Sequence, residues 1–216
     1  MDTVEAGRNR RRVAWPSTAI LTLGVSESVL SSWGADVVRR TRDGGSKLDV
    51  EIHTHRSPVV VDRVRSGEHM LGLCAGLADS AADLVVRTAA HESMVLIPSG
   101  LHPIRLTKGT PIITIEEHAA TWSSIERGVR EAGFEVSSTV ESFSAIARMA
   151  MAGLGHGLVP LGVARSAGLP PQQIQHLKRA RIRRTISLIG RRSVVARKPI
   201  ASFLERLEEE VALALA

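Results

Sequence analysis

Residues 140–160 place a helix, a glycine stop, a short apolar strand and a proline in one continuous stretch. Either Ser142 or Ser144 can cap the helix, because a hydroxyl at its start accepts a hydrogen bond from a free backbone N–H. Gly153 and Gly155 end it, since glycine readily adopts the left-handed backbone of a helix C-terminus. The strand and the closing proline follow at once. This order is typical of a helix that packs on a parallel sheet.

The first part of the chain alternates apolar strands with amphipathic helices. We expect a strand at residues 20–25, a helix from Ser26, a strand at 48–54, a helix from Ser57 and a strand at 70–74. Strands that alternate with helices predict a parallel sheet with right-handed crossovers.

A second group of strands and helices follows. Two further strands are expected at residues 84–88 and 93–98, and the loop at 99–103 marks a boundary. Beyond this loop we expect a strand at 111–116, a helix at 123–132, strands at 134–140 and 182–190, and a last helix from Pro199. The sequence therefore predicts an α/β fold in two parts.

The net charge of +6 raises the possibility of a nucleic-acid partner. Much of the excess positive charge lies in residues 8–12 and 178–184, which are interpreted as a solvated tail and a solvated strand edge. Aromatic residues make up only 3% of the chain, so platforms for base stacking are scarce. No zinc-ligand spacing of cysteine and histidine occurs. The composition argues against a nucleic-acid module.

Cys74 is the single cysteine, which excludes an internal disulfide and suits a reducing cytoplasm. It lies in an apolar run, so we expect a buried, inert thiol. No apolar stretch approaches the roughly 18 residues of a membrane helix. The basic N-terminus lacks the apolar core of a signal peptide. We therefore expect a cytoplasmic protein with no membrane partner.

Several motifs resemble the effector-binding domain of LysR-type transcriptional regulators. The most specific is residues 152–160, a glycine-rich turn followed by an apolar strand and a proline. The others are residues 21–28, 62–73 and 93–103 and the closing helix with Pro199, Phe203 and Leu207. The resemblance runs from about residue 20 to 212, although Met70 replaces the family's usual aspartate. The family's winged helix-turn-helix and linker helix are absent, which indicates an excised sensor domain or a natural truncation.

The resemblance implies two Rossmann-like lobes with an effector cleft between them, as in type II periplasmic binding proteins. Residues 1–17 would be a basic tail or linker remnant, 18–97 with 184–216 the first lobe, and 98–183 the second. The resemblance also implies a homodimer, possibly a tetramer in the full-length regulator. Trp33 and Val37 on one helix, with Met149 and Met151 on another, are expected to form the dimer contact.

Polar residues follow the expected strands at one edge, where ligands bind in open parallel sheets. The candidate effector-binding residues are Ser26, Glu27, Ser28, Thr54, His55, Arg56, Ser57, Glu116, His118, Thr121, Phe143 and Ser144. Hydroxyls, free N–H groups at helix starts and one guanidinium together suit a small carboxylate or similar anion.

Plainer structural interpretations of the same residues stay open. Ser26, Ser57 and Ser142 could simply be helix caps. Arg56 could be a solvated loop charge, and His118 could be a structural histidine.

Three other functions compete with sensing. An enzyme could use His118 with Glu116 or Glu117, but no nucleophile elbow, paired carboxylates, metal ligands or cofactor motif is present. A free-standing solute-binding protein would need a secretion signal, and a nucleic-acid module would need aromatic platforms. We therefore expect a non-enzymatic sensing and dimerisation domain without metal or cofactor, which reaches DNA only through a domain absent from this chain.

Overall fold

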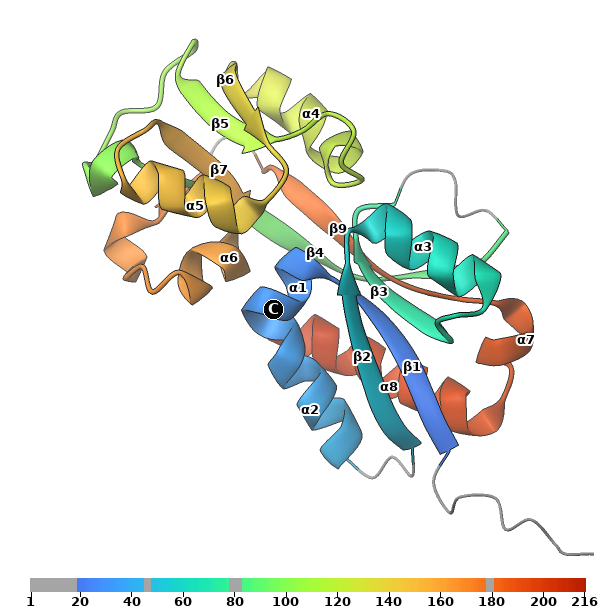
Figure 1. The fold of residues 1–216 in the computed structure, drawn as a ribbon. Helices are drawn as coiled ribbons and strands as arrows, with labels where there is room; N and C mark the ends of the chain where they lie inside the picture. Colours follow the sequence, from blue (N-terminus) through green and yellow to red (C-terminus); the bar gives the residue numbers. More distant parts are fainter. Residues whose placement is uncertain (1–18, 45–47, 78–82, 178–180) are drawn as a thin grey trace, which may run out of the picture.

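A computed structural model describes residues 19–44, 48–77, 83–177 and 181–216. The tail at 1–17 and the basic residues 178–180 lie outside these ranges. The strands form one curled sheet in the order β2-β1-β3-β9-β4-β7-β5-β6, with β8 beside β4 (Figure 1). They are β1 (Ala19–Ser26), β2 (Leu48–His55), β3 (Leu71–Ala75), β4 (Val85–Ile97), β5 (Pro111–Ile115), β6 (Glu135–Val140), β7 (His156–Pro160), β8 (Gln175–His176) and β9 (Arg183–Gly190).

Helices cover both faces of the sheet and connect its parallel strands (Figure 1). They are α1 (Glu27–Val29), η1 (Leu30–Gly34), α2 (Ala35–Asp43), α3 (Ser57–Ser66), η3 (Ser99–Leu101), α4 (Trp122–Glu131), α5 (Phe143–Met151), α6 (Leu161–Ser166), η4 (Pro171–Gln173), α7 (Arg192–Val195) and α8 (Lys198–Leu215). Among the helices described, none is long and apolar enough to cross a membrane.

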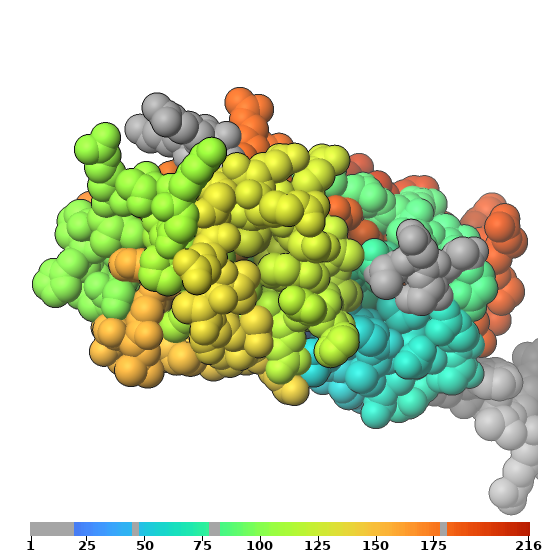
Figure 2. Space-filling model, turned by 90° about the horizontal axis from the view of Figure 1, so that it is seen from above, coloured from blue at the N-terminus to red at the C-terminus, as the bar shows by residue number. Residues whose placement is uncertain are grey.

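Two large clusters of buried apolar side chains lie at the two ends of the sheet. One joins β1 and β3 to α2 and α8, and a smaller cluster under α3 covers the opposite face. The other joins β5 and β7 to α4, α5 and α6. We call the elements around the first pair of clusters the first lobe and those around the other cluster the second lobe. Figure 2 shows the second lobe, green to orange, beside the first.

The two lobes share the long strands β4 and β9, which run antiparallel to each other. The prediction of two separate strands at 84–88 and 93–98 is wrong, because β4 continues across an irregularity between Thr88 and Ala90. Ala90 packs with the first cluster, whereas Met94 belongs to the second. The two clusters therefore meet along the middle of β4, close to the start of β9.

Local capping explains the stretch at 140–160. The Ser142 hydroxyl, and not that of Ser144, accepts a hydrogen bond from the first turn of α5, from Ala145 N at 3.5 Å. Gly153, with φ of +86°, follows the last turn in the left-handed conformation. The turn returns the chain to β7, which lies parallel to β5. This part of the fold is as the sequence predicted.

Cys74 is fully buried in β3, and burial raises the pKa of its thiol to about 12. An unfolded thiol ionises near its ordinary pKa of 9.0, whereas the folded one stays protonated to much higher pH. The stabilising effect is therefore complete below pH 9 and is lost as the pH rises toward 12.

We predict that the free energy of unfolding falls between pH 9 and 12 and that Cys74→Ala reduces this dependence. The chain has no tyrosine, so few other groups titrate in this window. Urea unfolding at several pH values measures it, with thiol labelling of the native protein at pH 8 as a control. Rapid labelling there would contradict a buried, inert thiol.

Candidate functional site

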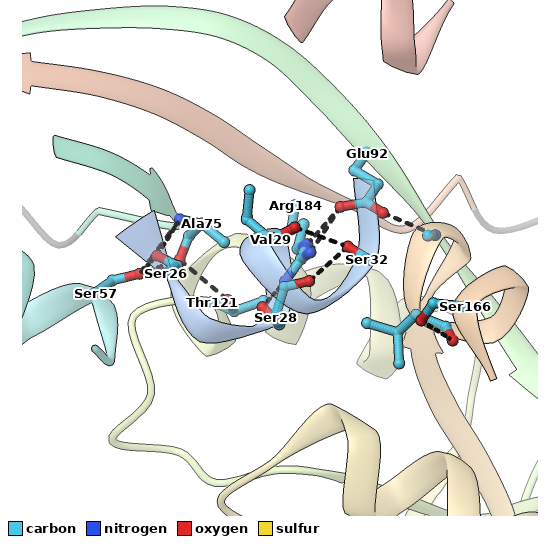
Figure 3. A network of polar contacts seen from close by, with 12 residues as sticks. Ser26, Ser28, Val29, Ser32, Ser57, Ala75, Glu92, Thr121, Ser166 and Arg184 are labelled. Carbon is cyan, nitrogen blue, oxygen red and sulfur yellow. Dashed lines mark hydrogen bonds and ion pairs between the residues drawn. The ribbon is translucent and has the colours of Figure 1, made fainter. Parts of the chain in front are cut away.

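Three hydroxyls converge on the backbone of Ala75 at the end of β3. Ser26 Oγ lies 2.7 Å from Ser57 Oγ, and the Ser57 hydroxyl donates to Ala75 O at 3.0 Å. Ala75 N donates to Ser26 Oγ at 3.1 Å, and Thr121 Oγ1 donates to Ala75 O at 3.2 Å (Figure 3). All three hydroxyl side chains are buried. Ser26 and Ser57 belong to the first lobe and Thr121 to the second, so this network spans the boundary between the lobes.

These serines do not act as helix caps. Ser26 makes no capping hydrogen bond to α1, and Ser57 is the first residue of α3, whose N-cap position is Arg56. The side chain of Arg56 makes no cap hydrogen bond either. The capping interpretation is therefore wrong for Ser26 and Ser57 and right for Ser142. In the first turn of α3, Pro58 has no N–H and Val60 N donates to Arg56 O, so the N–H groups of Ser57 and Val59 are the ones without an intrahelical partner next to the serine network.

A fully buried ion pair lies between the lobes. Arg184 is 0% exposed, and its Nε and Nη2 donate to Glu92 Oε2 at 2.9 and 2.7 Å. Its Nη1 donates to Ser28 Oγ at 2.7 Å, and Gly162 N donates to Glu92 Oε1 at 2.9 Å (Figure 3). The guanidinium carbon also lies 5.4 Å from the ring centroid of Phe143. One ion pair thus ties α1 of the first lobe to α5 and α6 of the second.

The interpretation of Arg184 as part of a solvated basic edge is wrong. Its strand β9 lies beside β4, and the sheet register places Glu92 directly opposite Arg184. A carboxylate on the neighbouring strand lets the guanidinium be buried, since buried charges need a paired and hydrogen-bonded partner. One sequence signal could have singled out Glu92: it lies two residues before the strongly apolar run at 94–97.

Arg56 lies at the mouth of the cleft between carboxylates of the second lobe. Its guanidinium is 3.7 Å from Glu116 Oε2 and 3.5 Å from Glu141 Oε2. The Arg56 side chain is 44% exposed and that of Glu141 is 67% exposed. Such exposed pairs contribute at most about 1 kcal/mol. Arg56 is thus held loosely, by partners that a ligand could replace.

The cleft is nearly closed. Its cavity has a volume of about 60 Å³, well below the roughly 300 Å³ of small ligand pockets. Gly76, with φ of +70°, packs so tightly that a Cβ there would lie 2.3 Å from Ala120 O. The cavity is lined by Ser26, Glu27, Ser28, Arg56, Ser57, Pro58, Ala75, Ile115, Ala119, Ala120, Thr121, Glu141 and Phe143.

The structure brings some of the candidate residues together and leaves others apart. Those that line the cleft cavity are Ser26, Glu27, Ser28, Arg56, Ser57, Thr121 and Phe143. Glu116 is adjacent through its ion pair, whereas Thr54, His55, His118 and Ser144 do not line the cavity. Thr54 and His118 are exposed. Ala75 and Glu141 line the cavity although the sequence did not single them out.

His55 belongs to a different cluster. Its ring stacks on that of His69, with centroids 5.6 Å apart, and His53 stacks on the same ring at 4.9 Å. Burial lowers the pKa of His55 and of His69, and neighbouring positive charge adds to the effect. The neutral forms of His55 and His69 are therefore favoured, and His55 packs against His69 and does not line the cleft cavity.

Comparison with known proteins gives the family. The family model described as the LysR substrate binding domain matches residues 17–212. The chain belongs to this family, whose domains have the type II periplasmic-binding-protein-like fold. It is therefore a regulatory, effector-binding type of domain from LysR transcriptional regulators, which confirms both the resemblance and the fold class.

Several solved structures share this fold. The reduced form of the OxyR2 regulatory domain from Vibrio vulnificus is similar with a TM-score of 0.71 and 16% identity, covering 90% of this chain and 96% of that one. The reduced OxyR regulatory domain from Pseudomonas aeruginosa has a TM-score of 0.71 and 18% identity, and the match covers 90% of this chain and 97% of that one. CbnR, a LysR family transcriptional regulator, has a TM-score of 0.70 and 18% identity, and the match covers 88% of this chain and 69% of CbnR. A search of curated protein sequences gave no match.

We predict that Arg184→Ala lowers the free energy of unfolding by about 3–5 kcal/mol, because it leaves the Glu92 carboxylate buried without its partner. Arg183→Ala is the matched control, since Arg183 is exposed on the same strand, and it should change stability by less than about 0.5 kcal/mol. Denaturant unfolding measures both. Equal effects of the two substitutions would show that the buried pair has no special role.

Proposed function

We propose that this chain senses a small organic anion in the cleft between its lobes and so controls transcription. DNA recognition would come from a domain outside this sequence. The protein would act in the cytoplasm. The serine network is the observation that carries the proposal. The buried hydroxyls of Ser26 and Ser57 do not cap their helices and lie beside the N-terminus of α3, which has free backbone N–H groups. Their position at the carboxyl ends of parallel strands is where α/β folds bind ligands.

The charges around the cleft support a binding mode in which an anionic effector replaces the carboxylate partners of Arg56. Among the described residues that line the cleft cavity, Arg56 is the one cation, and Glu27 and Glu141 are the carboxylates. An anion would therefore have to replace Glu141, and also Glu116 beside the cavity, at the guanidinium. Both carboxylates are partly or largely exposed and can return to water at small cost. The effector would then gain Arg56, the serine hydroxyls and the N–H groups of α3.

Sensing would proceed by a shift between lobe arrangements. The described cavity is too small for an effector of several atoms, so binding requires the contact between Gly76 and Ala120 to loosen. A ligand that prefers a more open arrangement stabilises it in proportion to its difference in affinity. The lobes would move about the middle of β4 and the start of β9, where the main chain joins them. The same motion would reposition attached DNA-binding domains.

A binding role also accounts for the lining better than catalysis does. Within the described residues, no histidine or cysteine lines the cleft cavity, and His118 lies exposed outside it. The lining offers hydroxyls without a general base in contact with them. We therefore propose no catalytic, metal or cofactor role for this site.

We further propose that the chain forms a homodimer, as the family resemblance implies, with the first helix of one copy against α5 of the other. The dimer residues need correction. Val37 is fully buried and offers no free apolar surface, whereas Trp33 packs beside Gly162 of α6 and stays partly exposed. Met149 and Met151 remain half-buried at the edge of the second core. Sedimentation at micromolar concentration should show dimers, and monomers alone would contradict this proposal.

The sensing proposal predicts opposite effects for two charge substitutions. A panel of small carboxylates is screened by thermal melting, since a ligand of the folded state raises the midpoint. For a carboxylate that binds, Arg56→Ala should weaken affinity about tenfold through loss of a charged contact. Glu141→Gln should strengthen it up to about fivefold by removing a competitor. Ser57→Ala should also weaken it.

Matched controls keep the fold and net charge comparable. Arg165→Ala and Glu117→Gln carry the same charge changes at exposed positions outside the cavity, and they should leave affinity unchanged. Unchanged affinity in both Arg56→Ala and Ser57→Ala, with melting midpoints intact, would place the effector elsewhere. A neutral amide analogue that binds as well as its carboxylate would refute the anionic effector.

A further inference from the structure

A much larger cavity lies in the second lobe, away from the cleft. Its volume is about 900 Å³, at the upper end of the range for small-molecule pockets. It lies between the loop that follows η3, the C-terminal end of α4 and the segment around η4 and β8. It shares no lining residue with the cleft cavity. The proposed sensing function makes no use of it.

The floor of this cavity is apolar. Leu101, Ile104, Leu106, Phe134 and Leu177 line it and are only partly buried, although each packs on the second core. Partly exposed large apolar side chains in a concave surface favour an apolar ligand, because covering them removes their surface from water.

Hydrogen bonds hold the loop wall in place. Gln175 Nε2 donates to Ile104 O at 3.1 Å and so ties the loop to β8. Thr110 Oγ1 donates to Thr107 O at 2.8 Å, and Gly109 N donates to Gly133 O at 2.7 Å beside α4. A wall fixed in this way reduces the ordering cost of binding.

The charge around the cavity is positive. Lys108 and Arg181 line it, and across the described ranges neither has an acidic side chain within ion-pair distance. Among the described lining residues Glu131 is the one carboxylate, and its Oε1 lies 3.7 Å from Nε of Arg127 on the outer face of α4. Two exposed cations beside an apolar floor complement a molecule with an apolar body and an acidic end.

We propose that this cavity is a second binding site, for an amphipathic organic anion whose aromatic or aliphatic body covers the apolar floor. Its carboxylate or sulfonate lies between Lys108 and Arg181. The site is independent of the cleft and would bind with the cleft empty or filled.

Fluorescence titration of the native protein with 1-anilinonaphthalene-8-sulfonate tests the site, because this probe combines an aromatic body with a sulfonate. The uncharged N-phenyl-1-naphthylamine is the companion probe. In the double variant Lys108→Gln, Arg181→Gln, the affinity for the sulfonate should fall about tenfold or more. The affinity for the neutral probe should stay within about twofold of the original, because the apolar floor is intact. Leu106→Glu should weaken both.

The control variant Arg165→Gln, Arg183→Gln removes the same charge from exposed positions that do not line the cavity, and it should leave both affinities unchanged. Affinities are compared only among variants whose melting midpoint equals that of the original protein. If the double variant melts at a lower temperature, the two single substitutions are used in its place. The proposal is overturned if the sulfonate affinity is the same in the cavity and control variants. It is also overturned if Arg56→Ala, in the cleft, is the variant that removes binding.

Discussion

The buried ion pair between Arg184 and Glu92 determines how the rest of the structure fits together. It lies where β4 and β9 pass from one core to the other, and its remaining hydrogen bonds reach Ser28 in the first lobe and Gly162 in the second. A charge buried this deeply needs an opposite charge and hydrogen-bond partners, and Arg184 has them in Glu92 and Ser28. The pair therefore specifies the relative position of α1 and α6, and with it the width of the cleft.

The cleft depends on that arrangement. Ser28 orients toward Arg184, which leaves Ser26 and Ser57 to bond each other and Ala75. Thr121 then completes the contact from the second lobe. The two serines are thus buried and hydrogen-bonded within the first lobe, whereas the contacts of this site with the second lobe include the Thr121 hydrogen bond and the exposed ion pairs of Arg56. This contrast suits a sensor whose specific contacts are prearranged and whose closure is weakly held.

The fold class could be predicted because its signals are local. Strands that alternate with helices and the glycine–proline punctuation of residues 140–160 need no long-range contact to be recognised. That Ser26, Ser57 and Thr121 lie close together could be predicted for a related reason, since parallel strands bring their carboxyl ends together. Arg184 was missed because its partner is 92 residues away and only the sheet register joins them. The position of His55 and His118 outside the lining of the cleft cavity could not be predicted, because side-chain direction at a strand end or in a turn depends on packing.

The central claim is that a ligand in the cleft changes the relative position of the lobes. The most direct measurement is the distance between spin labels on cysteines introduced at Asp62 on α3 and Arg127 on α4, in a Cys74→Ala background. Both positions are exposed, one on each lobe. A saturating cleft ligand should shift the distance distribution, and Ser57→Ala should require more ligand for the same shift. Identical distributions with and without saturating ligand would contradict the account.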